Sequence, residues 1–262
     1  MTVKDDSVLR SKLLDAAGVA HGFSTRLGGV SVGPYASMNL GWSVGDDPRA
    51  VEENHQRLAV AIGHDRGSLR LATQVHGANV LDADLVTRDR KSEPPGSGHD
   101  ALVSRRAGIA VGIRTADCVP ILVFDPATGG VAAIHAGWRG VVSGVVGSAL
   151  DVLVPYPASR SALVAVIGPH IRAERFEVGE DVARQIAAAS DASVVIPGAP
   201  RPHVDLARAI RIQLQRAGLE AARIDDVGGC TLGEPERFHS HRRDGDRSGR
   251  MLSVIVAAGA TT

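Results

Sequence analysis

The feature that most constrains the fold is the stretch between residues 109 and 140, where short apolar runs alternate with turn-forming residues. The runs are rich in β-branched side chains and occupy residues 109–113, 119–124 and 131–134. Asp125-Pro126 and Gly129-Gly130 separate the second run from the third. Short runs with Pro and Gly between them are typical of buried strands, because a helix needs a longer uninterrupted segment. This part of the chain therefore predicts strands that can lie side by side in a sheet.

Helix signals flank this stretch on both sides. Asp47 is a suitable N-cap, Pro48 suits the first turn, an apolar face continues to Ile62, and Gly63 ends the segment. Further helices are expected at 140–153, 179–189 and 204–217, and further strands at 20–24, 69–75, 78–82, 162–167, 223–227 and 251–257. Because strands and helices alternate only loosely, the pattern favours a mixed α/β assembly.

Glycine and proline mark two further features. Gly140, Gly144 and Gly147 recur at helical spacing. Each costs about 1 kcal/mol relative to alanine inside a helix, so their presence predicts the close approach of another backbone. Residues 86–99 are charged and rich in Pro and Gly, which predicts a mobile loop rather than a linker between domains.

Length and composition bound the class of protein. The 262 residues carry 29 basic and 29 acidic side chains, so no basic field favours nucleic acid. No apolar run is long enough to span a membrane, and the charged N-terminus lacks the apolar region of a signal peptide. Two cysteines cannot form a disulfide framework. We expect one domain over residues 1–262 in a cytoplasmic protein that is a monomer or a homodimer, with small molecules as its partners.

Polar residues stand where the predicted strands break. His76, Cys118 and His135 each lie at or beside a strand end, and one thiolate with two imidazoles suits zinc, with a fourth position open for catalysis. Spacing alone is weak support, because separations of 42 and 17 residues match no compact finger pattern. Three alternatives stay open. Cys118 is a packed core thiol, or it is a nucleophile with His135 as its base, or the three residues hold a purely structural zinc ion.

Basic residues near these strand ends are candidates for binding an anion. Arg139 follows His135 at a glycine-rich turn that opens a predicted helix, where backbone N–H groups and a guanidinium can meet a phosphate. Arg242 and Arg243, with Arg250, form a second cluster, whose simpler interpretation is a solvated basic turn. Asp117 either orients a ligating histidine or caps a turn.

Several motifs resemble those of one family, the laccase-domain or YfiH-like proteins, once named for polyphenol oxidase activity. The motifs that resemble its signatures are Thr115-Ala116-Asp117-Cys118-Val119-Pro120, His135-Ala136-Gly137-Trp138-Arg139-Gly140 and Thr73-Gln74-Val75-His76-Gly77. Shorter matches are Gly22-Phe23-Ser24-Thr25-Arg26, Gly28-Gly29-Val30-Ser31, Asn39-Leu40-Gly41, Glu177-Val178-Gly179, Arg242-Arg243-Asp244-Gly245 and Gly249-Arg250. The resemblance covers nearly the whole chain in order.

This resemblance implies both a fold and a function. The implied fold is α+β, a layered sandwich of mixed β-sheets flanked by helices. The implied ligands of Zn²⁺ are His76, Cys118 and His135. The implied activity is that of a zinc-dependent purine nucleoside phosphorylase, which splits adenosine, inosine and methylthioadenosine with phosphate into a base and a (methylthio)ribose 1-phosphate, with adenosine deamination as a further activity. The resemblance is also the reason to expect Arg26 and Asn39 in the pocket.

The older interpretation, a copper-dependent polyphenol oxidase or laccase, requires many histidines in His-x-His pairs. The chain has 10 histidines and one such pair, His239-Ser240-His241. Copper therefore remains the alternative metal. The usual signature of zinc deaminases, His-x-Glu with Pro-Cys-x-x-Cys, is absent from the sequence.

Overall fold

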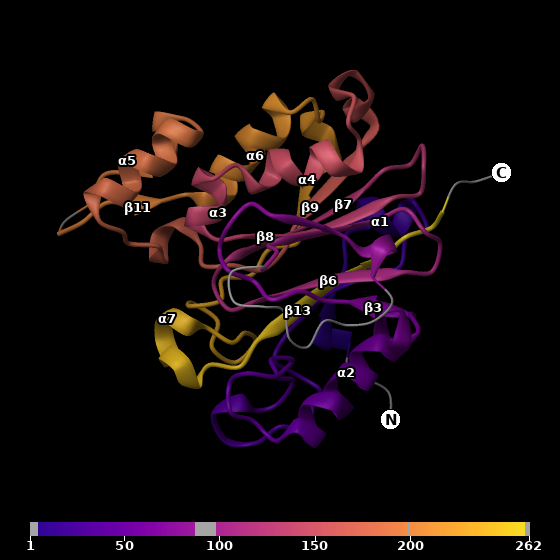
Figure 1. The fold of residues 1–262 in the computed structure, drawn as a ribbon. Helices are drawn as coiled ribbons and strands as arrows, with labels where there is room; N and C mark the ends of the chain where they lie inside the picture. Colours follow the sequence, from indigo (N-terminus) through magenta and orange to yellow (C-terminus); the bar gives the residue numbers. More distant parts are fainter. Residues whose placement is uncertain (1–4, 87–97, 199, 260–262) are drawn as a thin grey trace.

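The computed structural model describes residues 5–86, 98–198 and 200–259. In this part of the chain two large sheets stack face to face, and helices cover both outer faces (Figure 1). The fold is α+β, a layered sandwich of mixed sheets flanked by helices, which confirms the predicted architecture. No helix in the described ranges has both the length and the apolar character needed to cross a membrane.

The six-stranded sheet holds most of the central stretch. Its strands, in the spatial order β12-β9-β7-β8-β5-β4, are Ile224–Asp226, Val164–Ile167, Val119–Phe124, Val131–Ala136, Ala101–Ser104 and Val80–Asp82. The four inner strands pair antiparallel, whereas β12 runs parallel to β9 and β4 runs parallel to β5. The predicted pairing of neighbouring strands in the central stretch is confirmed for β7 and β8.

The five-stranded sheet joins the two ends of the chain. Its order β1-β2-β13-β6-β3 corresponds to Val8–Leu9, His21–Ser24, Met251–Val256, Ala110–Thr115 and Leu69–Arg70. Only β3 and β6 pair in parallel. The C-terminal strand β13 lies between β2 and β6, so residues near 250 are brought beside residues near 115.

Burial on both faces explains why the central strands are apolar without interruption. In β7, Ile121 faces a core shared with the outer helices, whereas Leu122 faces a core between the two sheets. In β13, Leu252 and Val254 instead face the helix α2, and Ile255 faces the other sheet. The sandwich therefore has a helix layer, two sheet layers and a second helix layer.

Helix α2, Pro48–Ile62, covers the five-stranded sheet and begins and ends as predicted, with Asp47 as N-cap and Gly63 in the left-handed conformation. The opposite layer consists of α3 (Trp138–Val142), α4 (Val145–Leu153), α5 (Glu180–Ala189) and α6 (Leu206–Arg216). The short helices α1 (Lys12–Ala16) and α7 (His241–Asp244) and the hairpin of β10 (Val195–Ile196) and β11 (His203–Val204) complete these elements. Short 3-10 helices lie at Asp5–Ser7, Gly33–Tyr35, Arg66–Ser68, Ala83–Leu85, Pro157–Ala162, Ala173–Arg175, Ala192–Val194, Ala221–Arg223 and Gly245–Arg247.

Two of the differences between the structure and the sequence prediction lie beside the proposed metal ligands. The helix expected over 140–153 is split into α3 and α4, because Gly144 takes a left-handed φ of 80°. The strand expected over 69–75 ends at Arg70, and the chain continues as an irregular segment to His76. The loop predicted at 86–99 lies largely outside the described residues, which exclude 87–97.

Candidate metal centre

The turn between β6 and β7 carries Cys118 across the gap between the two sheets. β6 belongs to the five-stranded sheet and β7 to the six-stranded sheet, so residues 116–118 connect the layers at one end of the sandwich. Asp117 has a left-handed φ of 92°. Its carboxylate accepts hydrogen bonds from the Thr231 hydroxyl and from the backbone N–H of Arg242, both at 2.6 Å. These bonds hold the turn and tie the start of α7 to it.

A buried carboxylate organises the two histidines. Asp100 is fully buried beside β5, and its Oδ1 lies 2.7 Å from Nδ1 of His135 on the adjacent strand β8. The same carboxylate accepts the backbone N–H groups of Val75, His76 and Gly77 at 3.2, 2.9 and 2.7 Å. His76 has a left-handed φ of 61°, an uncommon conformation for a residue other than glycine. Asp100 therefore orients one imidazole directly and stabilises the turn that carries the other.

His76, Cys118 and His135 meet as a compact group of potential metal ligands. One side-chain ligand atom of each lies within 4.8 Å of the others. The imidazole rings are 4.8 Å apart at 78°. A Cβ atom on Gly137 would lie 3.0 Å from both the Cys118 sulfur and the His76 ring, so a larger residue there would push these two side chains apart. One thiolate and two imidazoles fit a zinc-like ion.

The electrostatics of this group favour a thiolate. Burial raises the pKa of the Cys118 thiol, but the imidazoles of His135 and His76 outweigh burial and lower the pKa to about 6. Burial lowers the pKa of His135, but Cys118 and Asp100 outweigh it and raise that pKa to about 9. Burial also raises the pKa of Asp100, and the bonds from His135 and the backbone bring it below its usual value. The thiolate is the form that binds a metal ion or acts as a nucleophile.

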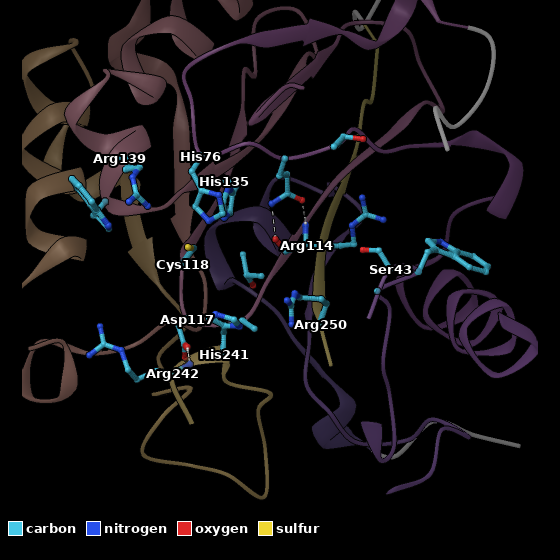
Figure 2. Close-up of a pocket in the computed structure, with 17 residues that line it drawn as sticks. Ser43, His76, Arg114, Asp117, Cys118, His135, Arg139, His241, Arg242 and Arg250 are labelled. Atoms are coloured by element: carbon cyan, nitrogen blue, oxygen red, sulfur yellow. Dashed lines mark hydrogen bonds between the residues drawn. The ribbon is translucent and has the colours of Figure 1, made fainter. Parts of the chain in front are cut away.

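The triad opens into a pocket of about 660 Å³ (Figure 2). His135 is buried, Cys118 is half-buried and His76 is exposed, so the group is accessible from this side. The other lining residues are Gly41, Trp42, Ser43, Thr73, Gln74, Arg114, Thr115, Ala116, Asp117, Trp138, Arg139, His241, Arg242 and Arg250. The lining contains four arginines but only one aspartate, and it includes both tryptophans of the chain. This size and lining suit a small anionic or aromatic ligand.

Of the polar residues that the sequence placed near the metal ligands, Asp117, Arg139, Arg242 and Arg250 line this pocket. Arg139 is exposed, with its guanidinium 4.5 Å from the centre of its neighbour's ring, Trp138. Arg242 is also exposed; it donates to the carbonyl of Glu177 and lies 5.6 Å from the Phe176 ring. Asp117 lines the wall but has both carboxylate oxygens engaged. The structure therefore brings Asp117, Arg139 and Arg242 together around the triad.

The structure places Arg26, Asn39 and Arg243 outside the lining of this pocket. Arg26 donates to the carbonyls of Ala36 and Pro235 and so braces two loops. Asn39 is fully buried, where it binds Gly41 and Asp46. Arg243 is held by Asp244 and by the carbonyls of Thr231 and Phe238. Their side chains are used in bracing contacts, which corrects the expectation that they face the pocket.

The single His-x-His pair does not join the triad. His239 is fully buried against Gly249 and Met251, whereas His241 lines the pocket from α7. Among the residues that the structure describes, the triad is the one cluster of at least three His, Cys, Asp or Glu side chains whose ligand atoms converge. This arrangement does not resemble the several histidine-rich centres that a multicopper oxidase needs.

The site contains two residues that the sequence alone did not reveal, Asp100 and Arg114, and one whose place it did not reveal, Arg250. Asp100 stands before a buried strand, a signal that could have drawn attention to it, but its role depends on the pairing of β5 with β8. Arg114 directly follows the strand predicted over 109–113 and lies within the observed strand β6. Arg250 was grouped with its neighbours in sequence, whereas the structure separates it from Arg243 and places it inside the pocket.

The fold and the site together define a class of α+β sandwich protein with a pocket-facing His-Cys-His group. Residues 20–258 match the model of the family described as multi-copper polyphenol oxidoreductase laccase, and the chain belongs to that family. Curated relatives carry a different activity in their names. The purine nucleoside phosphorylase of Deinococcus radiodurans is 41% identical over 238 residues, covering 90% of this chain and 88% of its own. That of Streptomyces coelicolor is 38% identical over 242 residues, covering 92% and 97%.

Solved structures show the same fold. The YfiH protein of Bacillus licheniformis superposes with a TM-score of 0.87 at 27% identity, covering 99% of this chain and 98% of that one. YlmD of Geobacillus stearothermophilus superposes with a TM-score of 0.84 at 31% identity, covering 98% of each chain. The likeness extends over nearly the full length of all three proteins.

Proposed function

We propose that this protein is a zinc-dependent purine nucleoside phosphorylase. It would split adenosine, inosine and methylthioadenosine with inorganic phosphate, giving the free base and ribose 1-phosphate or its methylthio form. One observation carries the proposal: a ligand group suited to zinc opens into a pocket lined by several guanidinium groups. The names of relatives 35–41% identical to the chain support the same reaction class.

His76, Cys118 and His135 would hold the metal ion. Zinc is preferred to copper because one thiolate and two imidazoles make a mixed S and N ligand set, and three protein ligands leave one position open. When bound, zinc would supply Lewis-acid chemistry, polarising a substrate group within its reach. Asp100 would fix the tautomer of His135, because a hydrogen bond at Nδ1 leaves Nε2 directed at the metal position.

The arginines would bind the attacking anion. In phosphorolysis a phosphate oxygen attacks the anomeric carbon, the N-glycosidic bond breaks, and its electron pair leaves with the base, which takes up a proton. The sugar carries positive charge in the transition state, so phosphate must be held close in a fixed orientation. Arg139 and Arg242 at the pocket mouth would contribute charge-assisted contacts, and Asp117 would fix the segment that carries Arg242.

A cysteine hydrolase is a second candidate, because the Cys118, His135 and Asp100 side chains form a nucleophile–base–orienter sequence. The two candidates use the same atoms but differ in metal dependence. Chelation would abolish phosphorolysis by a zinc enzyme. It would leave a cysteine hydrolase active, because the thiol would then be free to attack.

The test begins with metal analysis of protein purified without added metal. The protein is then assayed on inosine and on adenosine, with and without phosphate, with base and ribose 1-phosphate as the products measured. Inosine and ammonia appearing from adenosine would reveal the deamination that the family resemblance implies. Base and free ribose released at equal rates without phosphate would contradict phosphorolysis. Oxidation of a phenol with added copper, in the absence of either activity, would instead support the oxidase interpretation.

A further inference from the structure

Arg250 occupies a defined place at the end of the five-stranded sheet. It immediately precedes β13, in which Leu252 is the cross-strand partner of Arg114 on β6. Side chains two positions apart on a strand share a face, so Arg250 and Arg114 are diagonal neighbours on one face of this sheet. Both line the pocket, and in Figure 2 Arg250 lies between Cys118 and Ser43. Two arginines from neighbouring strands thus line the pocket, and Nη2 of Arg114 donates to the carbonyl of Ala72 at 3.0 Å.

The surrounding loop is shaped to hold Arg250. Its backbone N–H donates to Oδ1 of the fully buried Asn39 at 2.9 Å, and its carbonyl accepts the N–H of Leu40 at 2.9 Å. A Cβ atom on Gly41 would lie 2.8 Å from Cγ of Arg250, so the glycine leaves space for the arginine side chain. The 39–41 segment, which does not bring Asn39 itself into the pocket, therefore positions Arg250.

The guanidinium is fixed in place, with one edge unused. Nη1 donates to the carbonyls of Ser248 and Gly249 at 2.7 and 3.0 Å. Within the described chain, no hydrogen bond uses Nε or Nη2 of Arg250. An arginine presents five N–H donors, and the Nε–Nη2 edge matches two oxygens of a phosphate or carboxylate. Arg250 is thus oriented before any ligand arrives.

No carboxylate neutralises this charge in the part of the chain described. Arg172, by contrast, is paired with both oxygens of Asp226 at 2.7 Å. Asp117, the aspartate of the pocket, already accepts from Thr231 and from the Arg242 backbone. Burial lowers the pKa of Arg250, while Asp117 and Cys118 raise it, which places a partly desolvated cation near the triad. The free energy of a partly desolvated cation is lowered when an anion binds beside it, because the anion replaces part of the lost interaction with water.

We propose that Arg250, assisted by Arg114, is the principal anchor for a phosphate group in this pocket. This inference deepens the proposed function and rests on it for the identity of the phosphate as a substrate. Arg139 and Arg242 then act at the exposed mouth, whereas Arg250 holds the anion inside. The phosphate group is either free inorganic phosphate or the phosphate of a nucleotide, and the same bidentate edge recognises both.

The test measures binding directly, by isothermal titration of the purified protein with inorganic phosphate and separately with AMP. Arg250→Gln should raise the Kd of the phosphate-bearing ligand by about ten- to a hundredfold, because charge-assisted contacts are lost. The matched control is Arg211→Gln, since Arg211 is also half-buried and donates to a backbone carbonyl but lies outside the pocket. That variant should bind like the parent.

The arms of the experiment distinguish the outcomes. Weaker binding of inorganic phosphate by Arg250→Gln identifies free phosphate, and weaker binding of AMP alone identifies a nucleotide. Unchanged Kd values for both ligands, or no binding of either to the parent protein, would overturn the inference. Circular dichroism and zinc content check that the variant is folded; if it is not, Arg250→Lys keeps the charge but removes the bidentate edge and should still weaken binding several-fold.

The proposed function can fail separately from this inference. Binding through Arg250 without any cleavage of nucleosides would leave the anchor intact and contradict the phosphorylase. Phosphate-dependent cleavage with an unchanged phosphate KM in Arg250→Gln would support the phosphorylase and contradict the role of Arg250 as the phosphate anchor.

Discussion

At the scale of single residues, Asp100 connects the two histidines of the proposed metal site. It receives four hydrogen-bond contacts, from the imidazole of His135 and from three consecutive backbone N–H groups at 75–77. It therefore fixes the relative position of two proposed metal ligands that are far apart in sequence. A neutral amide at this place would present N–H donors where only an acceptor fits.

We expect Asp100→Asn to weaken zinc binding by about ten- to a hundredfold, the usual effect of losing a carboxylate behind a ligating histidine. Competition with a chelating dye measures the affinity. Asp125→Asn is the matched control: Asp125 is also buried and caps a turn, through Ala127 and Thr128, but lies outside the site. Equal zinc affinity in the two variants would show that Asp100 has no positioning role.

Cys118 provides the direct test of the ligand set. Cys118→Ser should reduce bound zinc sharply, because a neutral hydroxyl replaces a thiolate. Cys230→Ser should retain zinc, since Cys230 lies outside the triad and its sulfur accepts from the N–H of Gly233. Elemental analysis of both proteins after identical purification gives the comparison. Full zinc retention in the Cys118 variant would remove that residue from the proposed site.

A residue of the site could be predicted from the sequence when its position is marked by the local pattern of apolar runs and turns, and could not when its role depends on strand pairing. Cys118 and His135 stand at the breaks between apolar runs, so their neighbourhood is visible in the pattern. Asp100 and Arg250 acquire their roles from strand pairing: β5 with β8 for the first, β13 with β6 for the second. Such long-range register is absent from local patterns. Arg26 shares the motif match but braces a loop, because motif similarity does not indicate where a side chain points.

At the scale of elements, the strands were predicted better than the helix that follows the site. Continuous apolar runs reveal strands covered on both faces, and β7 was found with its observed bounds, Val119–Phe124. The periodicity of residues 140–153 suggested one helix, but Gly144 turns left-handed and separates α3 from α4. Of the three glycines expected to allow close backbone approach, Gly140 does so: a Cβ there would lie 3.1 Å from the carbonyl of Gly77.

The break in this helix gives a prediction with opposite signs at two glycines. Gly144→Ala should lower the free energy of unfolding by about 1 kcal/mol, because a left-handed φ of 80° is unfavourable for alanine. Gly147→Ala should raise it by up to about 1 kcal/mol, since residue 147 is helical and a Cβ there meets no atom within 4 Å. Urea denaturation measures both. A loss of stability in the Gly147 variant would contradict this description of α4.

At the scale of the whole molecule, buried neutral histidines should make stability depend on pH. Burial lowers the pKa of His55 and of His239 to about 3 and that of His170 to about 4. Each is protonated near pH 6.5 in the unfolded chain, so the unfolded state binds more protons as the pH falls from 6.5. Stability is therefore fully present above pH 6.5 and decreases toward the folded pKa values.

We expect the free energy of unfolding to fall between pH 7 and pH 5, by up to about 1.4 kcal/mol per pH unit for each histidine within the window. His55→Phe, which can keep the stacking on Trp42, should reduce this slope by about one proton. Comparison with the parent protein removes contributions common to both, such as loss of metal in acid. Identical slopes in the two proteins, from urea midpoints across the range, would count against a neutral buried His55.

The last prediction concerns what the metal does for the molecule as a whole. Three hydrophobic clusters fill the sandwich, between the sheets and beneath the helices on both sides, and they are built without the triad. A chain of 262 residues can bury enough apolar surface to fold without a metal clip. We therefore expect the chelated protein to keep its far-ultraviolet circular dichroism and a cooperative thermal transition while losing phosphorolysis. Small domains that depend on structural zinc instead unfold without it, because their metal-binding energy is folding energy. Cooperative unfolding on chelation at 25 °C, reversed by added zinc, would support a zinc-stabilised binding module in place of an enzyme.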